Sequence, residues 1–140
     1  MDQYFWIVTA LILIAGLGAM LAQQKHQQYK TVTPEEVQAL VNTKKNIVLL
    51  DVRTPGEFNS ETGHLKGAIL IPVQELHERI IELDPYKEKM IVAYCRSGNR
   101  SGRAASILTA AGFNAVNLVG GILRWTAEQH PLVTENKVTE

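Results

Sequence analysis

Residues 90–101 have the sequence MIVAYCRSGNRS, in which an apolar run gives way to a polar loop. The run at residues 90–94 predicts a buried strand, and the pattern of residues 101–111 predicts a helix. The loop between them contains Cys95, the only cysteine of the chain. A strand that ends in a short glycine-containing loop before a helix directs backbone N–H groups and the positive end of the helix dipole at an anion in the loop. We therefore expect the thiolate of Cys95 to be that anion.

Two arginines next to Cys95 strengthen this interpretation. Arg96 and Arg100 add positive charge, and such surroundings lower the pKa of a thiol from about 8.5 to between about 3.5 and 7.5. Much of Cys95 would then be nucleophilic at neutral pH. The alternative is a buried structural cysteine, which is the commoner state of a lone cysteine. The charged loop favours the nucleophile, because an interior strand continues apolar or ends in a neutral turn.

Four other segments match motifs of a known protein family. They are Asp51-Val52-Arg53 with Glu57-Phe58, residues 63–68 (GHLKGA), Ile71-Pro72, and Gly120-Gly121 with Trp125. Each segment is weak alone, but in this order, and together with the loop CRSGNRS, they are jointly specific. Residues 31–130 thus resemble the rhodanese-type sulfurtransferases. The resemblance implies a rhodanese-like α/β fold, with a mainly parallel five-stranded sheet flanked by helices.

The residue patterns also indicate an α/β fold without the resemblance, because strand-like runs alternate with helical ones. Residues 33–36 (TPEE) predict a helix start, in which Thr33 caps the helix, Pro34 occupies its first turn and Glu36 completes a capping box. Strands are predicted at residues 47–50, 69–71, 90–94 and 116–119, and further helices at residues 76–83, 101–111 and 122–129. At the carboxyl edge of such a sheet, where ligands bind, we expect Cys95.

The length of the loop distinguishes it from the loops of cysteine-dependent phosphatases. Those enzymes have five residues between the nucleophile and an essential arginine, whereas Arg100 follows Cys95 after only four. The position that a phosphatase would fill with arginine is Ser101. A smaller ring of N–H groups suits the terminal sulfur of a persulfide and not a phosphate, which favours sulfur transfer.

The resemblance implies a two-step reaction through a Cys95 persulfide. The donor would be thiosulfate or another persulfide, and the acceptor would be cyanide or a thiol, with no metal and no organic cofactor. A protein could serve as the sulfur acceptor. Because the chain has fourteen basic and fourteen acidic residues, nothing favours nucleic acid as a partner.

The expected site consists of Cys95, the loop that follows it and three supporting residues. N–H groups of the loop would stabilise the persulfide, and Arg96 and Arg100 would orient an anionic donor. The anion-binding loop comprises Arg96, Ser97, Gly98, Asn99, Arg100 and Ser101, and the supporting residues are Asp51, Arg53 and Glu57. The resemblance suggests a network that involves Arg53 and Glu57. His64 matches a structural histidine, Trp125 is expected in the core, and no metal-like spacing of histidines is found.

The N-terminus predicts a membrane anchor. Residues 4–22 contain no charged residue and, as a helix, would span about 28 Å, close to the about 30 Å of a bilayer core. A cleaved signal peptide is the alternative, but no lysine or arginine precedes the apolar run. Lys25 and Lys30 follow it, so the positive-inside rule places the catalytic domain in the cytoplasm, below the inner (plasma) membrane.

The expected organisation is therefore an anchor at residues 1–22, a polar tether at 23–30, a rhodanese-like catalytic domain at 31–133 and a tail at 134–140. The expected function is that of a membrane-anchored sulfurtransferase of the thiosulfate:cyanide type. The alternative is a rhodanese-like carrier or binding module that delivers sulfur to, or docks, one protein partner. Such modules commonly lack the cysteine, and this chain has it.

Overall fold

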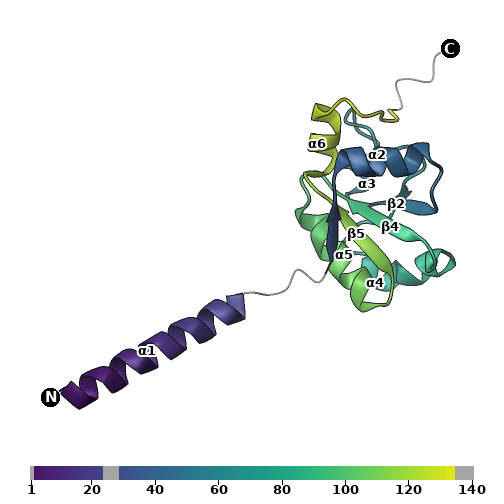
Figure 1. Cartoon of the computed structure of the whole chain (residues 1–140). Helices are drawn as coiled ribbons and strands as arrows, with labels where there is room; N and C mark the ends of the chain where they lie inside the picture. Colours follow the sequence, from purple (N-terminus) through teal and green to yellow (C-terminus); the bar gives the residue numbers. More distant parts are fainter. Residues whose placement is uncertain (1, 24–28, 135–140) are drawn as a thin grey trace, which may run out of the picture.

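Five strands form one sheet in the order β1-β5-β4-β2-β3, and every neighbouring pair is parallel (Figure 1). The computed structural model describes residues 2–23 and 29–134. The strands are β1 (Lys30–Val32), β2 (Ile47–Asp51), β3 (Ile69–Leu70), β4 (Met90–Tyr94) and β5 (Asn114–Leu118). The helices are α1 (Asp2–Gln23), α2 (Pro34–Asn42), α3 (Pro55–Phe58), α4 (Leu76–Arg79), η1 (Ile80–Tyr86), α5 (Asn99–Ala110) and α6 (Gly121–Ala127). The predicted α/β class and five-stranded sheet are confirmed, and the sheet is all-parallel rather than mainly parallel.

Helices cover both faces of the sheet, so that alternate residues of the central strand β4 enter two separate cores. Ile91 and Ala93 pack with α4, η1 and α5 on one face. Val92 and Tyr94 pack with α2 and α6 on the other face. A parallel sheet that is buried on both faces needs continuous apolar strands, and β4 has such a sequence. Its carboxyl end, from which the loop with Cys95 leaves, is fixed by packing from both sides.

Two helices begin with the same local device. Thr33 accepts from the N–H of Glu36, and the carboxylate of Glu36 accepts from the N–H of Thr33, which completes the predicted capping box of α2. The same reciprocal pair, Thr54 with Glu57, starts the short helix α3. In the second case the capping carboxylate also belongs to the candidate site described below.

One predicted helix is a mixed element. Residues 76–83 are expected to form a single α-helix, but the chain makes one α-turn in α4 and then continues as the 3₁₀-helix η1. Pro85 lies inside η1. Proline has no N–H and its ring collides with the carbonyl one α-turn earlier, so the segment turns with i to i+3 geometry before β4.

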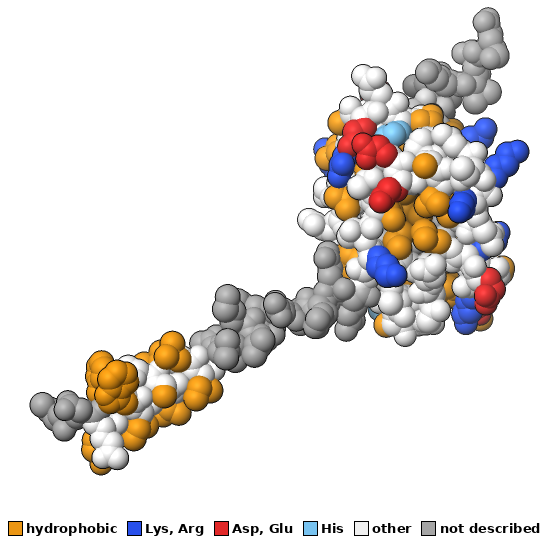
Figure 2. Space-filling model, in the orientation of Figure 1, with side chains coloured by type: hydrophobic (Ala, Val, Ile, Leu, Met, Phe, Trp, Pro, Cys, Tyr) orange, Lys and Arg blue, Asp and Glu red, His pale blue; other side chains and the backbone are white. Residues whose placement is uncertain are grey.

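The N-terminal helix α1 carries exposed apolar side chains, among them Trp6, Leu13 and Ile14 (Figure 2). Within the described part of the chain, however, no helix is long and apolar enough to cross a bilayer. The predicted transmembrane helix at residues 4–22 is therefore not supported. Of the predicted tether, residues 24–28 lie outside the described residues and Lys30 belongs to β1; of the predicted tail, residues 135–140 lie outside them.

Candidate active site

Cys95 directly follows β4 and is 1% exposed. Its Sγ accepts hydrogen bonds from the N–H of Gly98 at 3.1 Å and from the N–H of Ser101 at 3.4 Å. The hydroxyl of Ser101 lies 3.3 Å from the same sulfur. The loop turns back on the sulfur because Gly98 adopts φ +109°, in the left-handed region that favours glycine. The loop predicted as an anion site thus curls around Cys95 and directs N–H groups at it.

These donors lower the pKa of the thiol. Burial raises the pKa of Cys95, but hydrogen bonds from the hydroxyl and N–H of Ser101 and from the N–H groups of Gly98 and Ser97 outweigh it. The net effect is a pKa below the ordinary value of a cysteine. The sequence indicates both loop N–H groups and arginines as causes of a low pKa, and in the structure hydrogen bonds from the loop are the main lowering causes.

Asn117, in β5, is a site residue that the sequence does not indicate. Its Oδ1 accepts from the Ser101 hydroxyl at 2.6 Å, and its Nδ2 donates to the carbonyl of Gly98 at 3.2 Å. Asn117 therefore links strand β5 to Gly98 and Ser101, the two residues whose N–H groups donate to Sγ of Cys95. Because a hydroxyl has one hydrogen, Asn117 and the thiolate of Cys95 compete for the hydrogen of Ser101. No sequence signal distinguishes Asn117 from any other asparagine near a strand end.

The pair Gly120-Gly121 brings the start of α6 against the loop. The N–H groups of Ile122 and Leu123 donate to the carbonyls of Cys95 and Arg96, at 2.9 and 3.1 Å. Gly121 has φ +59°, and a Cβ there would lie 2.5 Å from each of these two carbonyl oxygens. A side chain at position 121 would therefore push the first turn of α6 away from the residues that hold the sulfur.

We expect Gly121→Ala to lower the free energy of unfolding by about 3 kcal/mol, because it combines backbone strain with this collision. The measurement is urea unfolding followed by circular dichroism. Gly112→Ala is the matched control, since Gly112 has φ +88° but nothing within 4 Å of its Cβ position. The close approach would be refuted if the two variants lost the same stability.

Arg100 and Glu57 form a bidentate ion pair at the start of α5. The two terminal nitrogens of Arg100 donate to the two carboxylate oxygens of Glu57, each at 2.7 Å. The sequence predicts that Arg100 faces the donor and that Glu57 belongs to a network with Arg53. In the structure the carboxylate of Glu57 binds Arg100 directly, and its charge is among the causes that raise the pKa of Arg53. Among the residues described, Arg96 is exposed and its side chain makes no ion pair or hydrogen bond.

Asp51 and Arg53 form a separate buried pair below the site. Arg53 donates from its backbone N–H, from Nε and from a terminal nitrogen to the carboxylate of Asp51, with the shortest contact at 2.7 Å. The same terminal nitrogen donates to the carbonyl of Gly63 at 2.8 Å. Both side chains are almost fully buried. Neither is among the residues that hydrogen-bond Sγ of Cys95, and the supporting role expected for them stays a prediction.

A comparison of the sequence with models of known protein families assigns the chain to one family. A model described as "Rhodanese-like domain" matches residues 33–128. The chain belongs to the rhodanese-like domain family. It is 37% identical over 122 residues to the uncharacterized protein YqhL of Bacillus subtilis, which covers 85% of this chain and 91% of that protein.

Two further relatives connect the fold with an activity and with a solved structure. Thiosulfate sulfurtransferase PspE of Escherichia coli is 40% identical over 73 residues, which covers 52% of this chain and 68% of PspE. The crystal structure of a rhodanese-related protein from Thermoplasma volcanium superposes with a TM-score of 0.68 at 31% identity, covering 75% of this chain and 98% of that one. The resemblance inferred from the motifs is thereby confirmed at the level of the family.

Two other motif residues of this rhodanese-like domain have packing roles. The ring of His64 stacks on Phe58 with centroids 3.7 Å apart, and its Nδ1 lies 3.1 Å from the carbonyl of Phe58. Trp125 is buried in the core beside α2, and its Nε1 donates to the carbonyl of Pro131 at 3.0 Å. Neither ring contacts Cys95. In the described part of the chain, no group of three or more His, Cys, Asp or Glu side chains could hold a metal ion.

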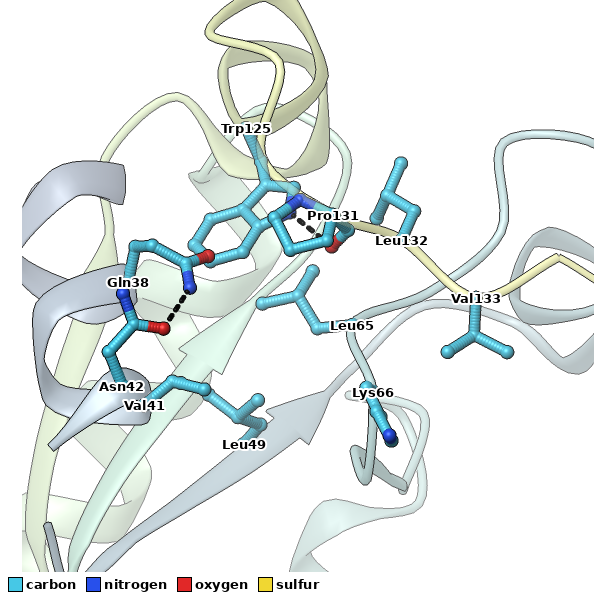
Figure 3. Close-up of a pocket in the computed structure, with 10 residues that line it drawn as sticks. All are labelled: Gln38, Val41, Asn42, Leu49, Leu65, Lys66, Trp125, Pro131, Leu132 and Val133. Atoms are coloured by element: carbon cyan, nitrogen blue, oxygen red, sulfur yellow. Dashed lines mark hydrogen bonds between the residues drawn. The ribbon is translucent and has the colours of Figure 1, made fainter. Parts of the chain in front are cut away.

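A cavity of about 260 Å³ lies beside Trp125, on the α2 and α6 side of the sheet (Figure 3). Its walls are mainly apolar and include Leu49, Leu65 and Leu132. None of its lining residues belongs to the loop around Cys95. The cavity is therefore separate from the candidate active site of the rhodanese-like domain.

The pH dependence of alkylation tests the hydrogen bonds to the thiolate. We expect the rate of reaction with iodoacetamide to reach half of its maximum at a pH below that of free cysteine, because the pKa of Cys95 is lowered. Ser101→Ala removes the strongest of the lowering contacts, so its midpoint should move up by about one pH unit. Ser106→Ala, on the same helix, is the control and should leave the midpoint in place. An unshifted midpoint in Ser101→Ala would contradict the assignment.

Proposed function

We propose that this rhodanese-like domain is a sulfurtransferase in which Cys95 carries the transferred sulfur as a persulfide. The observation that carries the proposal is the environment of the buried Sγ of Cys95, on which two N–H groups and one hydroxyl converge. Such preorganised donors stabilise negative charge on sulfur at a site shielded from water. The similarity to thiosulfate sulfurtransferase PspE supports the same class of reaction.

The first half-reaction loads the enzyme. The Cys95 thiolate attacks the outer, sulfane sulfur of thiosulfate, a new S–S bond forms, and the old S–S bond breaks so that sulfite leaves with its electron pair. The product is Cys95–S–S⁻, and no proton is transferred. The general base that His64 would otherwise supply is therefore unnecessary.

The second half-reaction returns the enzyme to its starting state. Cyanide attacks the outer sulfur of the persulfide, the bond to Cys95 breaks, and thiocyanate leaves while the thiolate is restored. A thiolate acceptor reacts in the same way and leaves as a new persulfide. Both half-reactions balance in atoms and electrons without a metal or an organic cofactor. They predict ping-pong kinetics.

The intact mass of the full chain tests the proposal directly. Thiosulfate is expected to add the mass of one sulfur atom, and cyanide is expected to remove it. Protein alkylated beforehand with iodoacetamide should gain nothing. If Cys95 alkylates readily but takes up no sulfur from thiosulfate or from a persulfide, the enzyme proposal fails.

The alternative function, delivery of sulfur to one protein partner, stays a prediction and uses the same persulfide. Acceleration of sulfur release by one protein, beyond the rate with small thiols, would favour it. The predicted location at the plasma membrane, with the catalytic domain in the cytoplasm, also stays a prediction.

A further inference from the structure

Glu57 balances one of the two positive charges that the loop carries. The two terminal nitrogens of Arg100 donate to the two carboxylate oxygens of Glu57 in hydrogen bonds of 2.7 Å. This bidentate arrangement is the most specific one between guanidinium and carboxylate groups. An arginine held in this way is less available to an incoming anion than a free one.

Glu57 is also held from its own helix and stays ionised. Its Oε2 accepts from the N–H of Thr54 at 3.0 Å and from the hydroxyl of Thr54 at 3.1 Å. The hydrogen bonds from Arg100 and then from Thr54 outweigh burial and lower the pKa of Glu57 to about 2. The carboxylate therefore keeps its negative charge, and its position, at any physiological pH.

The pair lies close to the reacting sulfur. Arg100 directly precedes Ser101, whose N–H donates to Sγ of Cys95 at 3.4 Å. After the hydrogen bond that Arg100 donates to Glu57, the charge of Cys95 is among the causes that raise the pKa of Arg100. When Cys95 is in the thiolate form that attacks a donor, the charges of the loop and its direct partners are Arg96 and Arg100 on one side and Glu57 and the Cys95 thiolate on the other. These four charges sum to zero. Without Glu57 the same loop would have a net charge of +1.

The charge of the loop affects sulfur donors unequally. Thiosulfate is a dianion, and a dianion interacts with each nearby charge about twice as strongly as a monoanion does. A persulfide, R–S–SH or R–S–S⁻, brings at most one negative charge on its reacting sulfur. A neutral loop therefore gives thiosulfate no electrostatic advantage, whereas a loop with a free arginine would.

We propose that Glu57 is a specificity-determining residue that, by pairing with Arg100, favours persulfide donors of low charge over the thiosulfate dianion. This inference rests on the proposed function. The favoured step is the attack of the Cys95 thiolate on the outer sulfur of R–S–SH. An S–S bond forms between Cys95 and that outer sulfur, and the S–S bond that joined the outer sulfur to R–S breaks. R–S⁻ leaves with the electron pair, and the proton stays on the transferred sulfur.

The experiment compares two donors in the full chain and in Glu57→Gln. The loading of Cys95 by thiosulfate and by cysteine persulfide is followed by rapid quenching and intact mass, which gives kcat/KM for each donor. We expect Glu57→Gln to raise the ratio of thiosulfate to persulfide kcat/KM about fivefold, because one unit of charge has been removed beside a dianion. Glu82→Gln is the matched control, since Glu82 is a paired carboxylate on η1, bound to Arg79. It should leave the ratio unchanged.

A second measurement does not depend on the fold of the variant. In the wild-type protein, thiosulfate loading should be nearly independent of salt between about 20 and about 200 mM, as expected of a neutral loop. A steep fall with salt would overturn the inference, as would an unchanged donor ratio in Glu57→Gln. If neither donor loads wild-type Cys95, it is the proposed function that fails.

Discussion

Cys95→Ser is expected to reduce thiosulfate:cyanide turnover by at least about a thousandfold. A serine hydroxyl is far less acidic than a thiol. The loop N–H groups, which stabilise a thiolate, would therefore face an uncharged hydroxyl that is a poor nucleophile. Attack by oxygen would also have to form an S–O bond in place of the S–S bond of a persulfide. Turnover is measured as the thiocyanate formed from thiosulfate and cyanide.

The substitution changes one buried atom and should leave the fold intact. Near-ultraviolet circular dichroism and the urea midpoint of Cys95→Ser should therefore remain close to those of the wild-type protein. Intact mass should show no sulfur on the variant after thiosulfate. Turnover within tenfold of the wild-type rate, in a variant with native spectra, would show that the loop without its thiol performs the reaction.

The features that could be predicted from the sequence are those with local causes. The start of α2 depends on Thr33, Pro34 and Glu36, which lie within one helical turn, so the capping box is visible in the sequence. The loop after β4 is equally local, because the N–H donors to Cys95 come from residues at most six positions later. Strand, loop and helix follow one another without a long connection.

The features that could not be predicted depend on distant parts of the chain. Arg100 and Glu57 are 43 residues apart, and only the pairing of β2 with β4 brings α3 next to the start of α5. Asn117 acts across 16 residues, from a strand that pairs with β4. The composition of the loop indicates its charge, but it does not show that one of its arginines is already balanced.

The buried pair of Asp51 and Arg53 is expected to dominate the stability of the domain. Arg53→Met should lower the free energy of unfolding by about 3–5 kcal/mol, because it leaves the Asp51 carboxylate buried without its counter-charge. The substitution also removes the hydrogen bond to the carbonyl of Gly63. Methionine resembles the arginine side chain in length, so little of the loss should come from a cavity. Urea unfolding gives the value.

A double-mutant cycle with Asp51→Asn separates the charge from the packing. If Arg53→Met lowers the free energy of unfolding by leaving the Asp51 carboxylate without a counter-charge, much of that loss should disappear when Asn replaces Asp51. Burying a neutral amide is far less unfavourable than burying an unpaired charge. The double variant should then be more stable than the sum of the two single losses predicts. Additive losses would instead indicate that Arg53 acts mainly through Gly63 and through its packing on Tyr94, whose ring centroid lies 5.7 Å from the guanidinium carbon. In that case the pair would hold the segment before β3 in place and would contribute little as an ion pair.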